Sequence, residues 1–65
     1  MNYEEILNKA SEIIAENNKQ SHHYNHLYVE EYNKGNEKIA TAYREQVRYF
    51  EAMNDGIYKL LKAIE

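Results

Sequence analysis

Two histidines and one carboxylate are spaced so that one side of a helix could present them to a metal ion. His22, His26 and Glu30 follow one another at intervals of four residues, and residues at i and i+4 face the same way on a helix. Imidazole and carboxylate donors suit Zn²⁺ or Ni²⁺. A structural site needs a fourth ligand, and none is evident nearby. We therefore prefer to interpret these residues as a polar helix face, and we expect no metal and no other cofactor.

The sequence lacks the usual signatures of catalysis. It has no cysteine nucleophile, no glycine-rich phosphate loop and no Ser–His–Asp arrangement. Paired carboxylates perform acid–base chemistry only in a concave, partly dry pocket, and a chain of 65 residues has little room for one. The sequence therefore predicts a protein that is not an enzyme.

Tyrosine is the residue type in marked excess. The chain has seven tyrosines but one phenylalanine and no tryptophan. Tyr combines a large apolar ring with a polar tip, which suits interfaces. Tyr24, Tyr28 and Tyr32 form an i, i+4, i+8 stripe flanked by Glu30 and Glu31. We predict that these five residues bind a protein partner, while packing of any one ring at the edge of the core remains an alternative.

Charge is distributed unevenly along the chain. Residues 1–33 carry six acids and two bases, whereas residues 34–65 carry five acids and six bases, and the whole chain is at −3. The single-sign basic footprint typical of nucleic-acid binding is missing. Arg44 and Arg48 lie four apart and could contact phosphates, but acidic residues interleave with them. We expect a protein partner, which could itself carry a basic or nucleic-acid-binding surface, and do not favour direct nucleic-acid binding.

The elements that must position these side chains are predicted to be helices, because the chain has no proline and two glycines. The first helix is expected over residues 3–18, with Asn2 as its N-cap, and a loop over residues 17–21 separates it from a second helix over residues 21–34. The apolar positions of the first helix follow the 3, 4, 3 spacing of one helical face: Tyr3, Ile6, Leu7, Ala10, Ile13 and Ile14.

Gly35 and Asn36 form a stop-and-restart signal, in which Gly ends one helix and Asn caps the next. The third helix, over residues 36–64, carries two interleaved heptad series. One is Tyr43, Phe50, Ile57 and Ile64, and the other is Ile39, Gln46, Met53 and Leu60. Val47 and Leu61 broaden this apolar face. The heptad continues through Asp55-Gly56 without a phase shift, so we expect one long helix and not a turn there. The core or oligomer contacts are predicted to be Ile39, Tyr43, Val47, Phe50, Met53, Ile57, Leu60, Leu61 and Ile64.

The expected fold is therefore all-α: one domain over residues 1–65 with two shorter helices and a long C-terminal helix, forming a small helical bundle. So short a chain is only marginally stable alone. The third helix, about 43 Å long at 1.5 Å per residue, overreaches its neighbours. We therefore expect dimerisation or a partner to complete the bundle.

The composition also indicates where the protein is located and which classes of function suit it. No apolar run is long enough to cross a bilayer, and the acidic N-terminus is unlike a signal peptide, so a cytoplasmic protein is expected. The abundance of Asn, Lys, Glu, Tyr and Ile is typical of an AT-rich genome, such as a low-GC bacterium or its phage. We predict a small acidic protein-binding module, an inhibitor or regulator of the phage anti-host or antitoxin-like kind. The alternatives are a small helix-turn-helix nucleic-acid-binding regulator and a purely structural self-associating protein.

Overall fold

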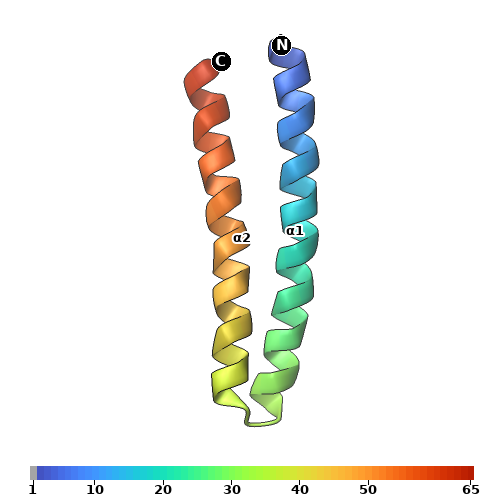
Figure 1. Cartoon of the computed structure of the whole chain (residues 1–65), viewed down its shortest axis with the longest axis vertical. Helices are drawn as coiled ribbons and strands as arrows, with labels where there is room; N and C mark the ends of the chain where they lie inside the picture. The colour runs from blue at the N-terminus through green and yellow to red at the C-terminus, as the bar shows by residue number, and fades with distance from the viewer. Residues whose placement is uncertain (1) are drawn as a thin grey trace.

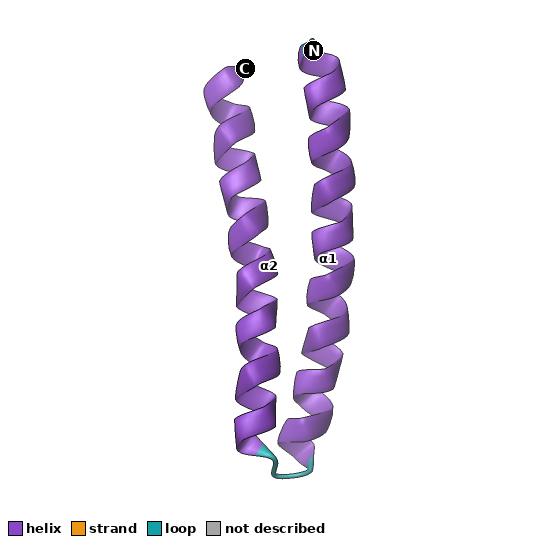
Figure 2. Cartoon of the chain, in the orientation of Figure 1, coloured by secondary structure: helices purple, strands orange, loops and turns teal. Residues whose placement is uncertain are grey.

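The computed structural model describes residues 2–65 and shows two helices that form an antiparallel hairpin. Helix α1 runs Tyr3–Asn33 and helix α2 runs Glu37–Ile64. The described residues contain no strand (Figure 2). The hairpin measures 49 × 16 × 11 Å, and its two chain ends lie at the end opposite the turn (Figure 1). Neither helix is both long and apolar enough to cross a membrane.

The prediction of two shorter helices before residue 35 was wrong, because α1 is continuous where a loop was expected over residues 17–21. That segment contains no Pro, which would remove a backbone N–H donor, and no Gly, which would weaken the helix through its conformational freedom. Asn has a low helix propensity, but here tertiary contacts decide the outcome. Asn17 is buried against α2, and the side chain of Asn18 accepts a hydrogen bond from α2.

The helices end and begin where the sequence predicts a break. Gly35 has φ +82°, a left-handed conformation that residues with a Cβ rarely adopt. The Asn36 amide donates to the Glu31 carbonyl and the Gly35 amide donates to the Tyr32 carbonyl, each at 3.0 Å. This pair of bonds is the Schellman motif that closes helix C-termini. At the other end of α1, the Asn2 side chain accepts from the Glu5 amide at 2.8 Å, which confirms the predicted N-cap.

Helix α2 runs without interruption through Gly56, as the unbroken heptad predicts. Its contact face with α1, here called the seam, consists of positions alternately three and four apart. The most enclosed are Ala40, Tyr43, Val47, Phe50, Asn54, Ile57 and Leu61, which are buried or half-buried. Of one predicted heptad series, Tyr43, Phe50 and Ile57 lie on the seam, whereas its last member, Ile64, is exposed. The second was placed one residue too early, because the seam passes through Val47 and Asn54 and not through Gln46 and Met53.

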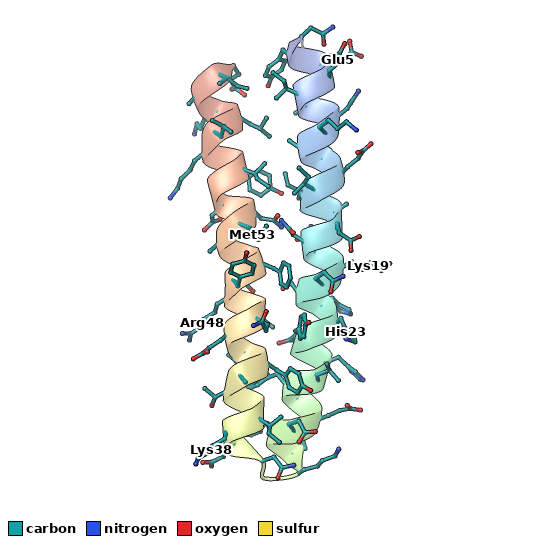
Figure 3. The ribbon with its side chains drawn as sticks, in the orientation of Figure 1. Glu5, Lys19, His23, Lys38, Arg48 and Met53 are labelled. Carbon is teal, nitrogen blue, oxygen red and sulfur yellow. The ribbon has the colours of Figure 1, made fainter. Side chains whose placement is uncertain are left out.

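The core is thin, since two helices enclose no third layer. The apolar residues buried among the described residues are Ala10, Ala40 and Val47. Of the predicted core set, Tyr43, Phe50, Ile57 and Leu61 are half-buried along the seam. Ile39, Met53, Leu60 and Ile64 are exposed in the single chain, so of the two roles predicted for them, core or oligomer contact, they do not fill the first within the hairpin. Figure 3 shows side chains filling the space between the ribbons along the hairpin.

A cluster of three asparagines crosses the middle of the hairpin. Asn17 and Asn54 are 5% and 7% exposed, and Asn17 Nδ2 donates to Asn54 Oδ1 at 2.9 Å. Asn54 Nδ2 donates to Asn18 Oδ1 at 2.9 Å and lies 3.5 Å from the Ile14 carbonyl oxygen. No buried side-chain polar atom of the described residues lacks a partner. Because unpaired buried amides are costly, this cluster favours one register of α1 on α2 over shifted ones.

Candidate functional site

The first tyrosine of the predicted partner surface lies between the helices. Tyr24 is half-buried, and its ring stacks on that of Phe50 with centroids 6.0 Å apart and planes 12° apart. The Tyr43 ring is 6.1 Å away. Tyr24 follows Asn17 by seven residues and so repeats its seam position. Its main contacts are therefore internal to the hairpin.

The other two tyrosines form a pair on one edge of the hairpin. The rings of Tyr28 and Tyr32 have centroids 6.0 Å apart. Arg44 of α2 places its guanidinium carbon 5.8 Å from the centre of the Tyr28 ring, within the range of a cation–π contact. Tyr28 is half-buried by this arrangement, whereas Tyr32 is 61% exposed. This edge therefore presents the exposed ring of Tyr32 to solvent, next to the Tyr28 ring, which Arg44 contacts.

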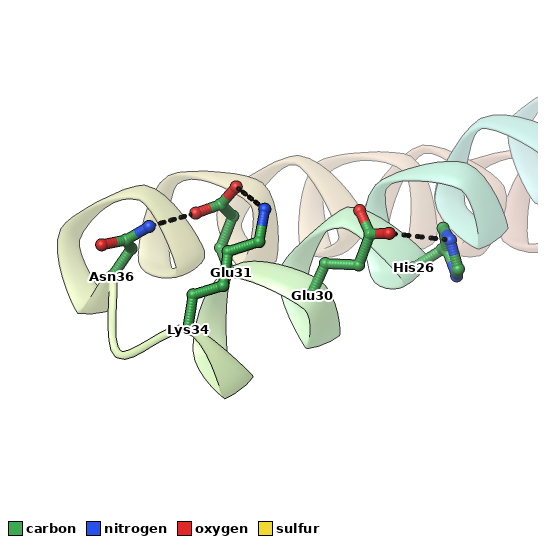
Figure 4. A network of polar contacts seen from close by, with 5 residues as sticks. All are labelled: His26, Glu30, Glu31, Lys34 and Asn36. Atoms are coloured by element: carbon green, nitrogen blue, oxygen red, sulfur yellow. Dashed lines mark hydrogen bonds and ion pairs between the residues drawn. The ribbon is translucent and has the colours of Figure 1, made fainter.

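Glu31 lies in the last helical turn of α1 and contacts the segment that joins the two helices (Figure 4). One carboxylate oxygen accepts from Asn36 Nδ2 at 2.7 Å, and the other lies 3.6 Å from Lys34 Nζ. Asn36 precedes α2 at the N-cap position, but its side chain makes no capping bond there and reaches back to Glu31 instead. The carboxylate supports the turn, and its side chain is only 19% exposed.

Glu30 points to another side of α1, because residues one or two apart do not face the same way on a helix. Its carboxylate lies 3.6 Å from His26 Nε2 (Figure 4). His22 is exposed one turn earlier. Within residues 2–65, no three His, Cys, Asp or Glu side chains are grouped so that they could hold a metal ion. The His22, His26 and Glu30 candidate therefore gains no geometric support.

The five predicted partner-binding residues are thus divided among four surroundings: the seam, the turn, the His26 side of α1, and the edge occupied by Tyr28 and Tyr32. Sequence reasoning missed two residues near that edge. Val29, three residues before Tyr32, is exposed, and Arg44 approaches from α2. The i, i+3 spacing of Val29 and Tyr32 was a readable signal, whereas the approach of Arg44 depends on how the helices pair. We call Tyr28, Val29, Tyr32 and Arg44 the tyrosine edge.

The part of the chain that the structure describes encloses no pocket. Polar side chains such as Lys19 and His23 on α1 and Lys38 and Arg48 on α2 project away from the other helix (Figure 3). Comparison with models of protein families, with curated proteins and with solved structures gives no match for this chain.

Proposed function

We propose that this chain is a non-catalytic protein-binding hairpin, an inhibitor or regulator of the phage anti-host or antitoxin-like kind, that docks through its tyrosine edge. The observation that carries the proposal is the exposure of Tyr32 beside Tyr28, which is half-buried and has the Arg44 guanidinium over its ring. Tyr is enriched among residues that dominate binding energy. A ring already held by its neighbours loses little entropy on binding, so this edge suits a partner with an apolar pocket.

Charge supports a partner that is basic around that pocket. Helix α1 carries six acids and two bases, so its outer surface is net negative. Glu30, beyond the tyrosine edge, keeps about half of its side chain exposed. Such a field speeds the encounter with a basic protein surface more than it strengthens the final complex. A partner that normally binds nucleic acid would carry a surface of this kind.

One observation favours the alternative of direct nucleic-acid binding. Arg44 lies over Tyr28, and Arg48 follows one turn later on α2, so arginine and aromatic groups that could contact phosphate and stack on bases are close together. A helix-turn-helix motif crosses its helices at about 90–120°, however, and here the two helices run side by side (Figure 1). This alternative would therefore use the edge of the hairpin and not a recognition helix.

Affinity capture with a matched pair of variants tests the proposal. Immobilised wild-type protein, Tyr32→Ala/Val29→Ala and Tyr58→Ala are incubated with lysate of a low-GC bacterium, and the retained proteins are quantified by mass spectrometry. Tyr58 is the control because it is also an exposed tyrosine but lies near the other end of the hairpin. We expect a protein retained by wild type and by Tyr58→Ala but not by the double variant.

The purified partner then permits a quantitative measurement. Loss of an aromatic hot spot costs about 2 kcal/mol or more, so titration calorimetry should show affinity at least about thirtyfold weaker for the double variant. Equal retention by the wild type and the double variant would contradict the proposal. Retardation of DNA or RNA at low salt that disappears with Arg44→Ala would support the nucleic-acid alternative instead.

A further inference from the structure

Helix α2 carries a second heptad pattern that does not face α1. Its members are again alternately three and four apart, and all are exposed: Ile39, Ala42, Gln46, Tyr49, Met53, Gly56, Leu60 and Ala63. We call this set the outer stripe. None of its residues is charged, although residues 39–64 contain seven charged side chains. A solvated face normally carries charge, so the pattern is typical of a second helix-packing surface.

The outer stripe lies on the edge of α2 opposite the tyrosine edge. Ile39, Met53 and Leu60 each directly precede a seam residue, whereas Arg44, which approaches Tyr28, directly follows one. Five residues, or about 140° around the helix, separate Ile39 from Arg44. The two surfaces are therefore distinct, and the inference below does not rest on the proposed function.

We infer that the outer stripe binds a second copy of this chain, with the two α2 helices antiparallel about a two-fold axis that passes through the stripe at the height of residue 51 along α2. Positions equally distant from residue 51 then meet in layers. A large residue faces a small one in three of the layers, as interdigitated packing requires: Ile39 with Ala63, Leu60 with Ala42, and Gln46 with Gly56. The fourth layer places Met53 against Tyr49, a favourable sulfur–aromatic pair.

Charges beside the stripe fit the same arrangement. Glu45, Ala52 and Lys59 repeat at intervals of seven along one flank. In the antiparallel dimer, Glu45 of each chain lies within about 3 Å along the axis of Lys59 of the other, given a rise of 1.5 Å per residue. The small Ala52 meets its own copy at the centre. Opposite charges thus face each other twice, which selects partner and orientation.

A parallel pairing is disfavoured by the same residues. Each layer would then join identical side chains, so that Tyr49 would face Tyr49 and Gly56 would face Gly56. Bulky and empty layers would alternate, and empty layers are costly in packed interfaces. Glu45 would also lack its lysine partner. The antiparallel pairing places large residues opposite small ones and Glu45 opposite Lys59, whereas the parallel pairing does neither.

The exposed area of the single hairpin agrees with a missing neighbour. The chain exposes 5164 Å², while a compact monomer of 7.8 kDa is expected to expose about 4,400 Å². The excess of about 800 Å² is comparable to the area that each partner contributes to a standard protein–protein interface. Four exposed apolar side chains of the stripe are available for burial, with exposures of 37–62%: Ile39, Tyr49, Met53 and Leu60, of which Met53 is labelled in Figure 3.

Sedimentation equilibrium of the purified protein tests the inference, with helicity followed by circular dichroism. We expect a dimer for wild type and for Tyr58→Glu, which changes an exposed residue outside the stripe. Leu60→Glu introduces a charge into a layer and should raise the dimer dissociation constant at least about a hundredfold. A wild-type monomer at millimolar concentration would overturn the inference, as would an unchanged dimer of Leu60→Glu.

Charge reversal tests the orientation even if Leu60→Glu lowers helicity. Glu45→Lys and Lys59→Glu should each weaken the dimer about two- to fivefold at low salt, as expected for exposed pairs. The double variant Glu45→Lys/Lys59→Glu should restore wild-type affinity, because both exchanged pairs are again of opposite sign. Failure of the double variant to restore affinity would overturn the antiparallel register.

Discussion

Replacing the buried Asn54 by Ala should destabilise the hairpin, although Ala is the better helix former. The substitution removes the acceptor of Asn17 Nδ2, which lies 2.9 Å away at a site only 5% exposed. Leaving such a buried donor unpaired costs about 1–3 kcal/mol. The gain in helix propensity from Asn to Ala returns about 0.5 kcal/mol. We therefore expect a net loss of about 0.5–2.5 kcal/mol in the free energy of unfolding.

Replacing both partners should have the opposite sign. In Asn17→Leu/Asn54→Leu no amide is left unpaired, and each Leu gains up to about 1.5–3 kcal/mol from burial. Paired buried polar groups can often be exchanged for apolar ones with a gain in stability, so the double variant should be about 2–4 kcal/mol more stable than wild type. Its register should be less uniquely defined, because Leu layers can shift by a heptad without leaving a polar group unpaired.

Urea denaturation followed by far-ultraviolet circular dichroism measures these changes, at one fixed protein concentration because association alters apparent stability. Asn25→Ala is the matched control, since Asn25 is an exposed residue of α1 that lies outside the asparagine cluster. It should change stability by less than about 0.5 kcal/mol. If Asn54→Ala is as stable as wild type, or if the double Leu variant is less stable, the account of the asparagine cluster is refuted.

Four further substitutions probe the seam, the turn and α2. Phe50→Ala should lower the free energy of unfolding by about 2–3 kcal/mol, less than for a fully buried ring, because Phe50 is half-buried against Tyr24; an unchanged melting temperature would contradict this packing. Gly35→Ala should cost about 1–2 kcal/mol because of its positive φ, whereas Gly56→Ala should stabilise α2 by up to about 1 kcal/mol, and equal effects in thermal melts would refute the distinction. Glu31→Ala should cost about 0.5–1.5 kcal/mol by removing its bond to Asn36, and urea denaturation showing no loss would exclude a role in the turn.

Much of the fold could be predicted because its signals are local. Gly35 marks the turn through its own backbone conformation, and Asn2 caps α1 through an amide three residues away. The heptad through Gly56 correctly indicated one continuous helix, because a turn would have shifted its phase. Tyr43 and the residues seven apart from it identified half of the seam.

The errors arose where distant residues decide the outcome. Asn17 was assigned to a loop because Asn has a low helix propensity. Its hydrogen-bond partner, Asn54, is 37 positions away in the chain, so local sequence does not reveal the contact. Asn54 also obscured the true heptad series. Because Asn54 is polar and its neighbour Met53 is apolar, the apolar pattern was assigned to the series that contains Met53. Once those two asparagines are paired, α1 becomes continuous, three expected helices become two, and the exposed series on α2 needs a different explanation.

The surroundings of the tyrosines could not be read from their spacing. Tyr24 and Tyr32 are two turns apart, and one stripe at intervals of four rotates gradually around a helix whose period is 3.6 residues. Tyr24 therefore reaches the seam, where it stacks on Phe50, while Tyr32 is directed to solvent. Which end of the stripe is enclosed depends on the position of α2, which the spacing alone does not give.

The arrangement of the chain ends determines how the hairpin would respond to mechanical force. Both ends lie at one end of the hairpin, and the Gly35 turn lies at the other (Figure 1). Tension applied between the ends would peel the helices apart one layer at a time, as in opening a zipper, instead of shearing all layers together. Resistance would be low at first and would rise at the Asn17–Asn54 layer near the middle. Pulled in this way, the hairpin would extend in two steps, whereas tension applied from the turn to one chain end would load α1 or α2 along its axis.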